Sequence, residues 1–239
     1  MNDTVAGLLQ LGALVVLLAA VYVPLGDYMA RVFTGERHLR VEKAIYRVAR
    51  VDADSGQRFP TYAAALLAFS FSGVVLLYLI QRFQPLLPMG FGRGVDGAGI
   101  PPAMAFNNAV SFVTNTNWQS YVPEQVVGNT VQMAGFTVQN FLSAAVGLAV
   151  AVAVVRGFVR AGSDRLGNAW VDIVRGSVRI LLPLAVVGAV VLIALGTVMS
   201  LKAGVAVTGP DGKSSTIALA PVASQESIKE LGTNGGGIL

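Results

Sequence analysis

The chain has no cysteine, and His38 is its single histidine. Disulfides and thiolate metal sites are therefore excluded. No second histidine or carboxylate cluster accompanies His38, so we expect an exposed surface residue there and not a metal ligand. Charge is also scarce, because 13% of the residues are charged and 54% are hydrophobic. Soluble domains average about 25% charged residues. The shortage of charge indicates a membrane protein.

Four apolar runs are long enough to cross a bilayer, which takes about 20 residues in a helix. They cover residues 5–25, 62–80, 130–155 and 178–199. An apolar N-terminal run can also be a cleaved signal peptide, but no basic residue precedes this one and its apolar stretch is too long. We therefore expect an all-α polytopic membrane protein with four spans.

The formal net charge of +4 could suggest nucleic acid, but the basic residues follow membrane topology. Seven lie between the first two spans: Arg31, Arg37, Arg40, Lys43, Arg47, Arg50 and Arg58. Five lie between the last two: Arg156, Arg160, Arg165, Arg175 and Arg179. The loop 81–127 has only Arg82 and Arg93. By the positive-inside rule, both basic connectors are cytoplasmic, and the N-terminus, the 81–127 loop and the tail are external.

The first basic connector has two interpretations. Within residues 35–51, Val41, Ala44, Ile45 and Val48 recur at helical spacing. They could form a helix lying on the cytoplasmic surface. The alternative is a solvated connector held by lipid headgroups.

Two short apolar segments are too short to span a bilayer. Residues 90–99 contain five glycines and predict an external loop, after which Pro101 and Pro102 open a helix over 103–113. A second short helix is expected over 221–231, after an external insertion with a turn at 209–212. Both should be re-entrant helices that cover about half the bilayer.

A polar loop follows each short helix. The first reads Thr-Asn-Thr-Asn over 114–117 and the second reads Thr-Asn-Gly-Gly-Gly over 233–237. Main-chain carbonyls in such loops can replace the water shell of a cation, as in an ion selectivity filter. We expect Gly235, Gly236 and Gly237 to supply the backbone freedom that this requires. The C-terminal dipole of the preceding helix would favour a cation at the loop.

An internal repeat supports the filter hypothesis. The second span begins near residue 62 and the fourth near 178, which is 116 positions later, and Thr116-Asn117 recurs as Thr233-Asn234 after 117 positions. The two units therefore share one predicted period. The second unit lacks a return span before residue 239, so further chain or other subunits must complete a ring of loops.

Polar residues also occur where lipid would disfavour them. The third span begins with Asn129, Thr130 and Gln132, followed by Gln139 and Asn140. Gln132 and Gln139 share a helical face, which should look inward, either for interhelical hydrogen bonds or to line a water path. The second short helix carries Glu226, Lys229 and Glu230, which require a protein-enclosed or watery setting.

Several strings resemble the A subunits (KdpA) of Kdp-type potassium-transporting ATPases, a family within the superfamily of potassium transporters. They are AVSFVTNTNWQSY at 109–121, QMAGFTVQNFLSAA at 132–145, LGNAWVD at 166–172, and VASQE at 222–226 with GTNGGG at 232–237. The resemblance implies an extra N-terminal helix and four helix–pore loop–helix repeats around one pore. By that template, 1–30 is the extra transmembrane helix, 31–60 the cytoplasmic connector and 61–160 the first repeat. Residues 161–239 are the first half of the second repeat, truncated after its filter. The family usually continues with phenylalanine after the three glycines, whereas Ile238 and Leu239 follow here.

The resemblance also implies the site. The first filter strand falls on Asn115, Thr116 and Asn117, with Gln119 near the ion entrance, and the second on Thr233, Asn234 and Gly235. These residues should bind dehydrated K+ through main-chain oxygens, with Thr hydroxyls and Asn amides as additional candidates. Trp118 and Tyr121 would either support the filter from behind or lie at the outer interface, and packing is the interpretation that we favour for both.

The implied function is selective binding and inward translocation of K+ in a bacterial plasma membrane, with the N-terminus and the filters external. The sequence has no G-x-x-x-x-G-K-[ST] loop and no Asp-Lys-Thr-Gly-Thr motif, so we expect no ATP site in this chain. The resemblance implies an ATP-hydrolysing B subunit and small C and F subunits as partners. A passive or cation-coupled K+ channel or transporter of the same superfamily is the alternative, and a non-transporting scaffold is the third class.

Overall fold

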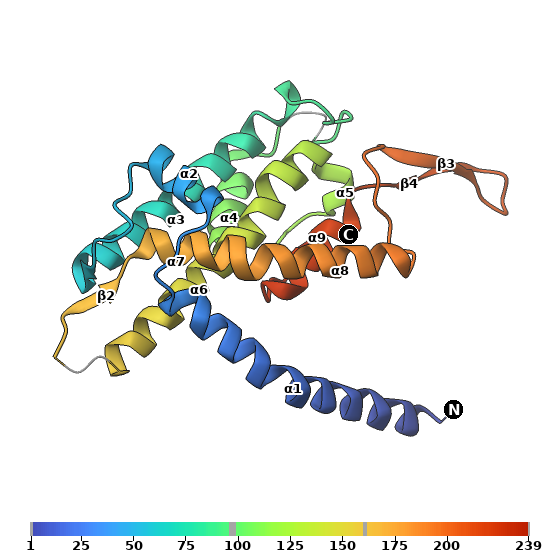
Figure 1. Cartoon of the computed structure of the whole chain (residues 1–239). Coiled ribbons are helices and arrows are strands. Elements are labelled where there is room, and N and C mark those ends of the chain that lie inside the picture. The colour runs from blue at the N-terminus through green and yellow to red at the C-terminus, as the bar shows by residue number, and fades with distance from the viewer. Residues whose placement is uncertain (1, 96–98, 160–161, 239) are drawn as a thin grey trace.

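The structure is a computed structural model that describes residues 2–95, 99–159 and 162–238 (Figure 1). Arg160, part of the predicted glycine loop (96–98) and Leu239 lie outside the described residues. The helices are α1 (Asp3–Thr34), α2 (Arg40–Ala49), α3 (Phe59–Arg82), η1 (Gln84–Leu86), α4 (Pro102–Val113), α5 (Pro123–Val126), η3 (Val131–Thr137), α6 (Val138–Val159), α7 (Ala169–Arg175), η4 (Gly176–Leu181), α8 (Leu182–Ala194) and α9 (Val222–Leu231). The strands are β1 (Gln57–Arg58), β2 (Arg165–Gly167), β3 (Gly204–Thr208) and β4 (Ser214–Ala218).

Among the residues that the structure describes, four helices are long and apolar enough to cross a membrane, which confirms the predicted spans: Asp3–Thr34, Phe59–Arg82, Val131–Val159 and Ala169–Ala194. The third and fourth each include a π-helical stretch, η3 and η4 respectively. Such wide turns often occur at functional sites. The four apolar helices make the protein a polytopic membrane protein.

The predicted limits of the fourth span, 178–199, are wrong at both ends. The helix starts at Ala169, because the Asn168 side chain accepts hydrogen bonds from the main-chain nitrogens of Trp170 and Val171. It ends at Ala194, two residues before Gly196 adopts a φ of +96°. Arg175 and Arg179 consequently belong to the helix and not to a basic connector.

Each of two spans packs against the short helix that follows it. The α3 helix contacts α4, the α8 helix contacts α9, and α6 touches both short helices. The two expected short helices are therefore present as α4 and α9. The prediction that the two span-plus-loop units share one sequence period is wrong. The spans α3 and α8 end 112 residues apart (82 and 194), whereas the short helices α4 and α9 end 118 residues apart (113 and 231). The second unit has a longer connection between span and short helix.

That longer connection contains strands that an all-α prediction missed. Strands β3 and β4 form an antiparallel hairpin that pairs Gly204 with Ala218 and Thr208 with Ser214. The predicted turn at 209–212 joins them, with Gly209 N–H bonded to the Lys213 carbonyl at 2.9 Å. The hairpin projects at the end of the molecule where α1 begins, opposite α2 and β2 (Figure 1). A second small sheet pairs β1 with β2 and ties the two basic connectors together.

The main hydrophobic core lies between α3, α4 and η3. Its buried members are Leu77, Ile100, Ala105, Ala109, Phe112, Val127, Val131 and Phe136. Phe112 and Phe136 stack with ring centroids 4.3 Å apart. Since Phe112 is in the last turn of α4, this core fixes the point from which the first polar loop departs.

The first basic connector contains a protein-packed helix. On α2, Glu42 and Tyr46 are buried, and Glu42 pairs with Arg179 through both oxygens at 2.5 Å. Burial raises the pKa of Tyr46 to about 12. The prediction of an exposed His38 is wrong: its side chain is only 15% exposed, because it lies edge-on to Tyr46 and 3.5 Å from an Arg175 nitrogen.

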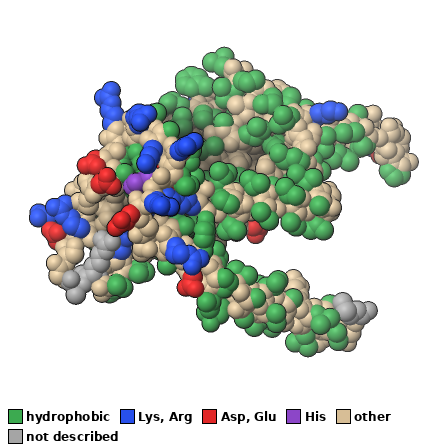
Figure 2. Space-filling view, viewed as in Figure 1, with side chains coloured by type: hydrophobic (Ala, Val, Ile, Leu, Met, Phe, Trp, Pro, Cys, Tyr) green, Lys and Arg blue, Asp and Glu red, His purple; other side chains and the backbone are tan. Residues whose placement is uncertain are grey.

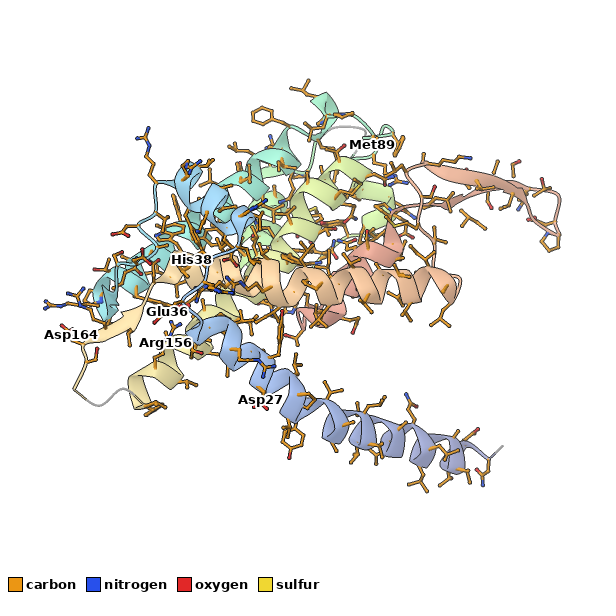
Figure 3. All side chains as sticks on the ribbon, in the orientation of Figure 1. Asp27, Glu36, His38, Met89, Arg156 and Asp164 are labelled. Atoms are coloured by element: carbon orange, nitrogen blue, oxygen red, sulfur yellow. The ribbon has the colours of Figure 1, made fainter. Side chains whose placement is uncertain are left out.

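Arginine side chains anchor the end of α1 to the bundle. Arg156 forms a two-pronged ion pair with Asp172 at 2.5 and 3.0 Å and donates to the Phe33 carbonyl at 3.0 Å. Arg175 donates to the Val32 carbonyl at 3.3 Å. Figure 3 shows Glu36, His38 and Arg156 gathered where α1 ends, whereas Asp27 points away from the bundle. Basic and acidic side chains concentrate at this end, and apolar side chains cover most of the remainder (Figure 2).

Because of the Glu42–Arg179 ion pair, we expect the packing of α2 against the bundle to weaken at acidic pH. Burial alone would raise the pKa of Glu42, but hydrogen bonds from Arg179 and Leu39 and nearby arginine charges outweigh it and lower the pKa below 4.5. A lowered pKa gives stability that is complete above about pH 4.5 and is lost as pH falls through the folded-state value. Glu42→Gln should lower the melting temperature by a few degrees at pH 7 and flatten its fall toward pH 4. Thermal unfolding at both pH values checks this, with Glu36→Gln as the exposed control; parallel pH curves would contradict it.

Candidate ion-binding site

The first filter loop (residues 114–119) folds back over the end of α4. Asn115 and Asn117 have φ values of +64° and +61°, a left-handed conformation that asparagine tolerates better than most residues. The main-chain nitrogens of Thr116 and Asn117 both donate to the Ser111 carbonyl, at 2.9 and 3.2 Å. The Ser111 hydroxyl also accepts from the Trp118 N–H at 2.7 Å. The loop is thus held against the helix C-terminus.

The second filter loop (residues 232–237) leaves α9 by the same turn. Asn234 N–H donates to the Lys229 carbonyl at 3.0 Å, as Thr116 N–H does to Ser111. These matching bonds lie 118 residues apart (111 and 229), so Thr116 corresponds to Asn234. The predicted equivalence of Thr116 with Thr233 is therefore off by one position. Thr233 has a φ of +56°, which is strained for a β-branched residue by about 1–3 kcal/mol.

The two filter loops lie side by side. Asn115 Nδ2 donates to the Gly232 carbonyl at 3.1 Å, and Gly237 N–H donates to Gln119 Oε1 at 2.9 Å. A Cβ added to Gly235 would lie 3.2 Å from the Thr116 carbonyl oxygen. The structure thus brings all seven predicted site residues into one region: Asn115, Thr116, Asn117, Gln119, Thr233, Asn234 and Gly235.

The three glycines of the second loop differ in how closely the first loop approaches them. We expected them to provide backbone freedom, and none of the three, all of which the structure describes, has a positive φ. A Cβ on Gly236 would overlap the Asn117 carbonyl oxygen and lie 2.8 Å from Gln119 Oε1. Glycine is required at Gly236 because the first loop passes against its α-carbon.

Helix α6 holds both loops from one side. Asn140 is fully buried; its Oδ1 accepts from Asn117 Nδ2 at 2.6 Å, and its carbonyl accepts from Asn234 Nδ2 at 3.0 Å. Ser143 donates to Asn115 Oδ1 at 2.9 Å. We expected the Gln132–Gln139 face to look inward, and Asn140, which lies off that face, is buried as well. Sequence reasoning missed Ser143, although its position three residues after Asn140 places it on the same helical face.

The family model described as "KdpA: Potassium-transporting ATPase A subunit" matches residues 12–239. The chain belongs to this family. It is 57% identical to a "Potassium-transporting ATPase potassium-binding subunit" of Kineococcus radiotolerans, over 99% of this chain and 42% of the relative. Proteins of the same name from Nocardia farcinica and Mycobacteroides abscessus are 56% and 55% identical, over 100% of this chain and 42% and 43% of their own lengths. The chain thus spans about two fifths of the length of these relatives.

The polar face of the third span is buried in this KdpA-family chain. Gln132 and Gln139 are 1% and 4% exposed. Gln225 Nε2 on α9 donates to Gln132 Oε1 at 3.4 Å, so Gln132 forms one of the two predicted alternatives, an interhelical hydrogen bond. Gln139 packs where α3 passes closest, 3.2 Å from a Cβ placed on Gly73.

The two aromatic residues near the first filter loop differ in their roles. Tyr121 packs on the main core, and its hydroxyl accepts from Asn108 Nδ2 at 3.1 Å and from Gln119 Nε2 at 3.3 Å. The packing favoured for Tyr121 is confirmed. The packing favoured for Trp118 is wrong, because its side chain is 73% exposed.

The side-chain amides of the loops are largely occupied by one another and by α6. Asn115, Asn117 and Asn234 all donate to partners within these segments. Main-chain oxygens and threonine hydroxyls therefore remain as the groups best placed to face an ion. A cavity of about 640 Å³ adjoins both loops, where Thr114 and Thr233 line it together with apolar side chains from α1, α3 and α8.

Proposed function

We propose that this chain binds K+ selectively and passes it inward as the channel-like subunit of an ATP-driven potassium pump. The observation that carries the proposal is the convergence of two polar loops, each at the C-terminus of a short helix, with α6 tying them together. Carbonyl-lined loops at helix C-termini suit a bare monovalent cation. The names of the relatives agree with this function.

The proposed K+ ligands are main-chain oxygens of the two filter loops. The residues concerned are Asn115, Thr116 and Asn117, with Gln119 at the entrance, and Thr233, Asn234 and Gly235. Residues 1–30 serve as an added transmembrane helix, 31–60 as the cytoplasmic connector, and 61–160 as one helix–loop–helix repeat. Residues 161–239 supply the first half of a second repeat.

The pump requires partners. ATP hydrolysis would occur on a separate B subunit, with C and F subunits in the complex, because this sequence has no phosphate-binding loop of the G-x-x-x-x-G-K-[ST] type. We place the complex in the bacterial plasma membrane with the filters external, since the basic side chains gather at the end that bears α2 and β2 (Figure 2).

The test is ATP hydrolysis by the assembly that co-purifies with this chain, tagged at its N-terminus in its native membrane. Potassium should stimulate hydrolysis, whereas sodium and choline at equal ionic strength should not. Potassium binding without any associated ATPase would favour the passive or cation-coupled transporter instead. An assembly that shows no K+ binding and no ATP hydrolysis would contradict both functions.

A further inference from the structure

Helix α9 carries an ion pair beside the second filter loop that the proposed function does not use. Lys229 Nζ lies 2.6 Å from one Glu226 oxygen and donates to the other at 2.9 Å. The two side chains are only 16% and 24% exposed. Charges inside membrane proteins are costly and usually serve a function. The corresponding helix α4 has no charged residue.

We infer that the Glu226–Lys229 ion pair positions the outer part of the second filter loop at Gly237 and so determines ion selectivity. This inference rests on the proposed function. A Cβ added to Gly237 would lie 3.4 Å from Glu226 Oε1 and 3.5 Å from Lys229 Nζ. Gly237 therefore lies beside both charged groups, and its N–H donates to Gln119 of the first loop.

Lys229 holds the second loop at another point as well. Its carbonyl accepts from the Asn234 N–H at 3.0 Å and from Asn234 Nδ2 at 3.5 Å. The residue thus contacts the loop near its start through the main chain and near its end through the side chain. A shift of Lys229 would move both contacts together.

The first unit performs the same task with neutral groups. At the 118-residue spacing, Ser111 corresponds to Lys229 and Asn108 to Glu226. The Ser111 hydroxyl accepts from the Trp118 N–H at 2.7 Å, and Asn108 Nδ2 donates to the Tyr121 hydroxyl at 3.1 Å. Ser111 therefore supports the first loop directly, and Asn108 does so through the Tyr121 hydroxyl, which accepts from Gln119 Nε2 at 3.3 Å. In the second unit, loss of the Glu226 charge would also leave the exposed Glu230, 3.8 Å away, as the counter-charge of the Lys229 ammonium, so that more of its positive charge would repel a cation at the loop.

The experiment compares Glu226→Gln with Glu230→Gln in the purified assembly. Glu230 is the matched control, because it lies on the same helix, 3.8 Å from Lys229, and is 75% exposed. The measured quantities are the K+ and Rb+ concentrations that half-saturate binding, together with the melting temperature without either ion. Glu226→Gln should weaken K+ binding by at least about tenfold and lower the preference for K+ over Rb+, whereas Glu230→Gln should change both by less than about twofold.

The reversed pair Glu226→Lys with Lys229→Glu should recover most of the K+ preference, which a purely local packing role would not predict. Equal ion preferences for Glu226→Gln, Glu230→Gln and the wild type would overturn the inference and leave the proposed function standing. A wild-type assembly that binds no K+ would instead remove the proposed function. If Glu226→Gln does not assemble, Glu226→Asp takes its place: a lowered K+ preference supports the inference, and an unchanged one overturns it.

Discussion

Replacing Gly236 by alanine is expected to reduce K+ affinity by roughly ten- to a hundredfold in the assembled protein. The added methyl would overlap the Asn117 carbonyl oxygen and lie 2.8 Å from Gln119 Oε1 and 3.1 Å from Phe112 Cζ. Phe112 is fully buried and stacked on Phe136, so it has little room to move. The two filter loops must therefore separate, which alters the proposed ion-binding geometry itself.

Neighbouring glycines provide a graded control. A Cβ on Gly235 meets one atom at 3.2 Å, and a Cβ on Gly237 meets nothing closer than 3.4 Å. Alanine at Gly235 or Gly237 should therefore weaken K+ affinity less than alanine at Gly236. Gly12→Ala on α1, where nothing lies within 4 Å, should leave it unchanged. The K+ affinity of all four variants is measured by K+ titration of ATP hydrolysis. Similar affinities for Gly236→Ala and Gly12→Ala would contradict the proposed packing of the two loops.

Much of the architecture could be predicted from the sequence. Long apolar runs identify the spans because a bilayer imposes a minimum helix length. Paired prolines at residues 101 and 102 mark the start of α4, and a polar face in the third span indicates an inward orientation, which the buried Gln132 and Gln139 confirm. These features depend on local composition, which one sequence displays directly.

Other features depend on long-range contacts. Arg175 and Arg179 look like connector residues until the carboxylate of Glu42 and the end of α1 are placed beside them. The matching Thr-Asn pairs suggest a spacing of 117, whereas the helix ends set it at 118. The turns use Asn115, Asn117 and Thr233 in the left-handed conformation, whereas glycine is needed at Gly236 for the close approach of the first loop. None of these choices follows from residue type alone.

Asn140→Ala is expected to lower K+ affinity by a similar factor, roughly ten- to a hundredfold, through a different cause. The substitution removes the oxygen that accepts from Asn117 Nδ2 at 2.6 Å. Asn117 is only 3% exposed, so its amide would be left buried and unpaired, which costs about 1–3 kcal/mol. Asn117 should relieve this by moving, and its carbonyl is one of the proposed K+ ligands. The neighbouring Val138→Ala on α6, 38% exposed, is the control and should bind K+ normally.

A double-mutant cycle separates this mechanism from general destabilisation of α6. If Asn140 acts through the amide of Asn117, then Asn117→Gly removes the group that would be left unpaired and still accepts the φ of +61°. The double variant Asn117→Gly with Asn140→Ala should therefore bind K+ no more weakly than Asn140→Ala alone, with a coupling of about 0.5–3 kcal/mol. Additive losses would show that Asn140 supports the loops by another route, through the packing of α6. The Asn234 amide is bound by the Asn140 main-chain carbonyl, which alanine retains, so the second filter loop keeps that contact in every variant of the cycle.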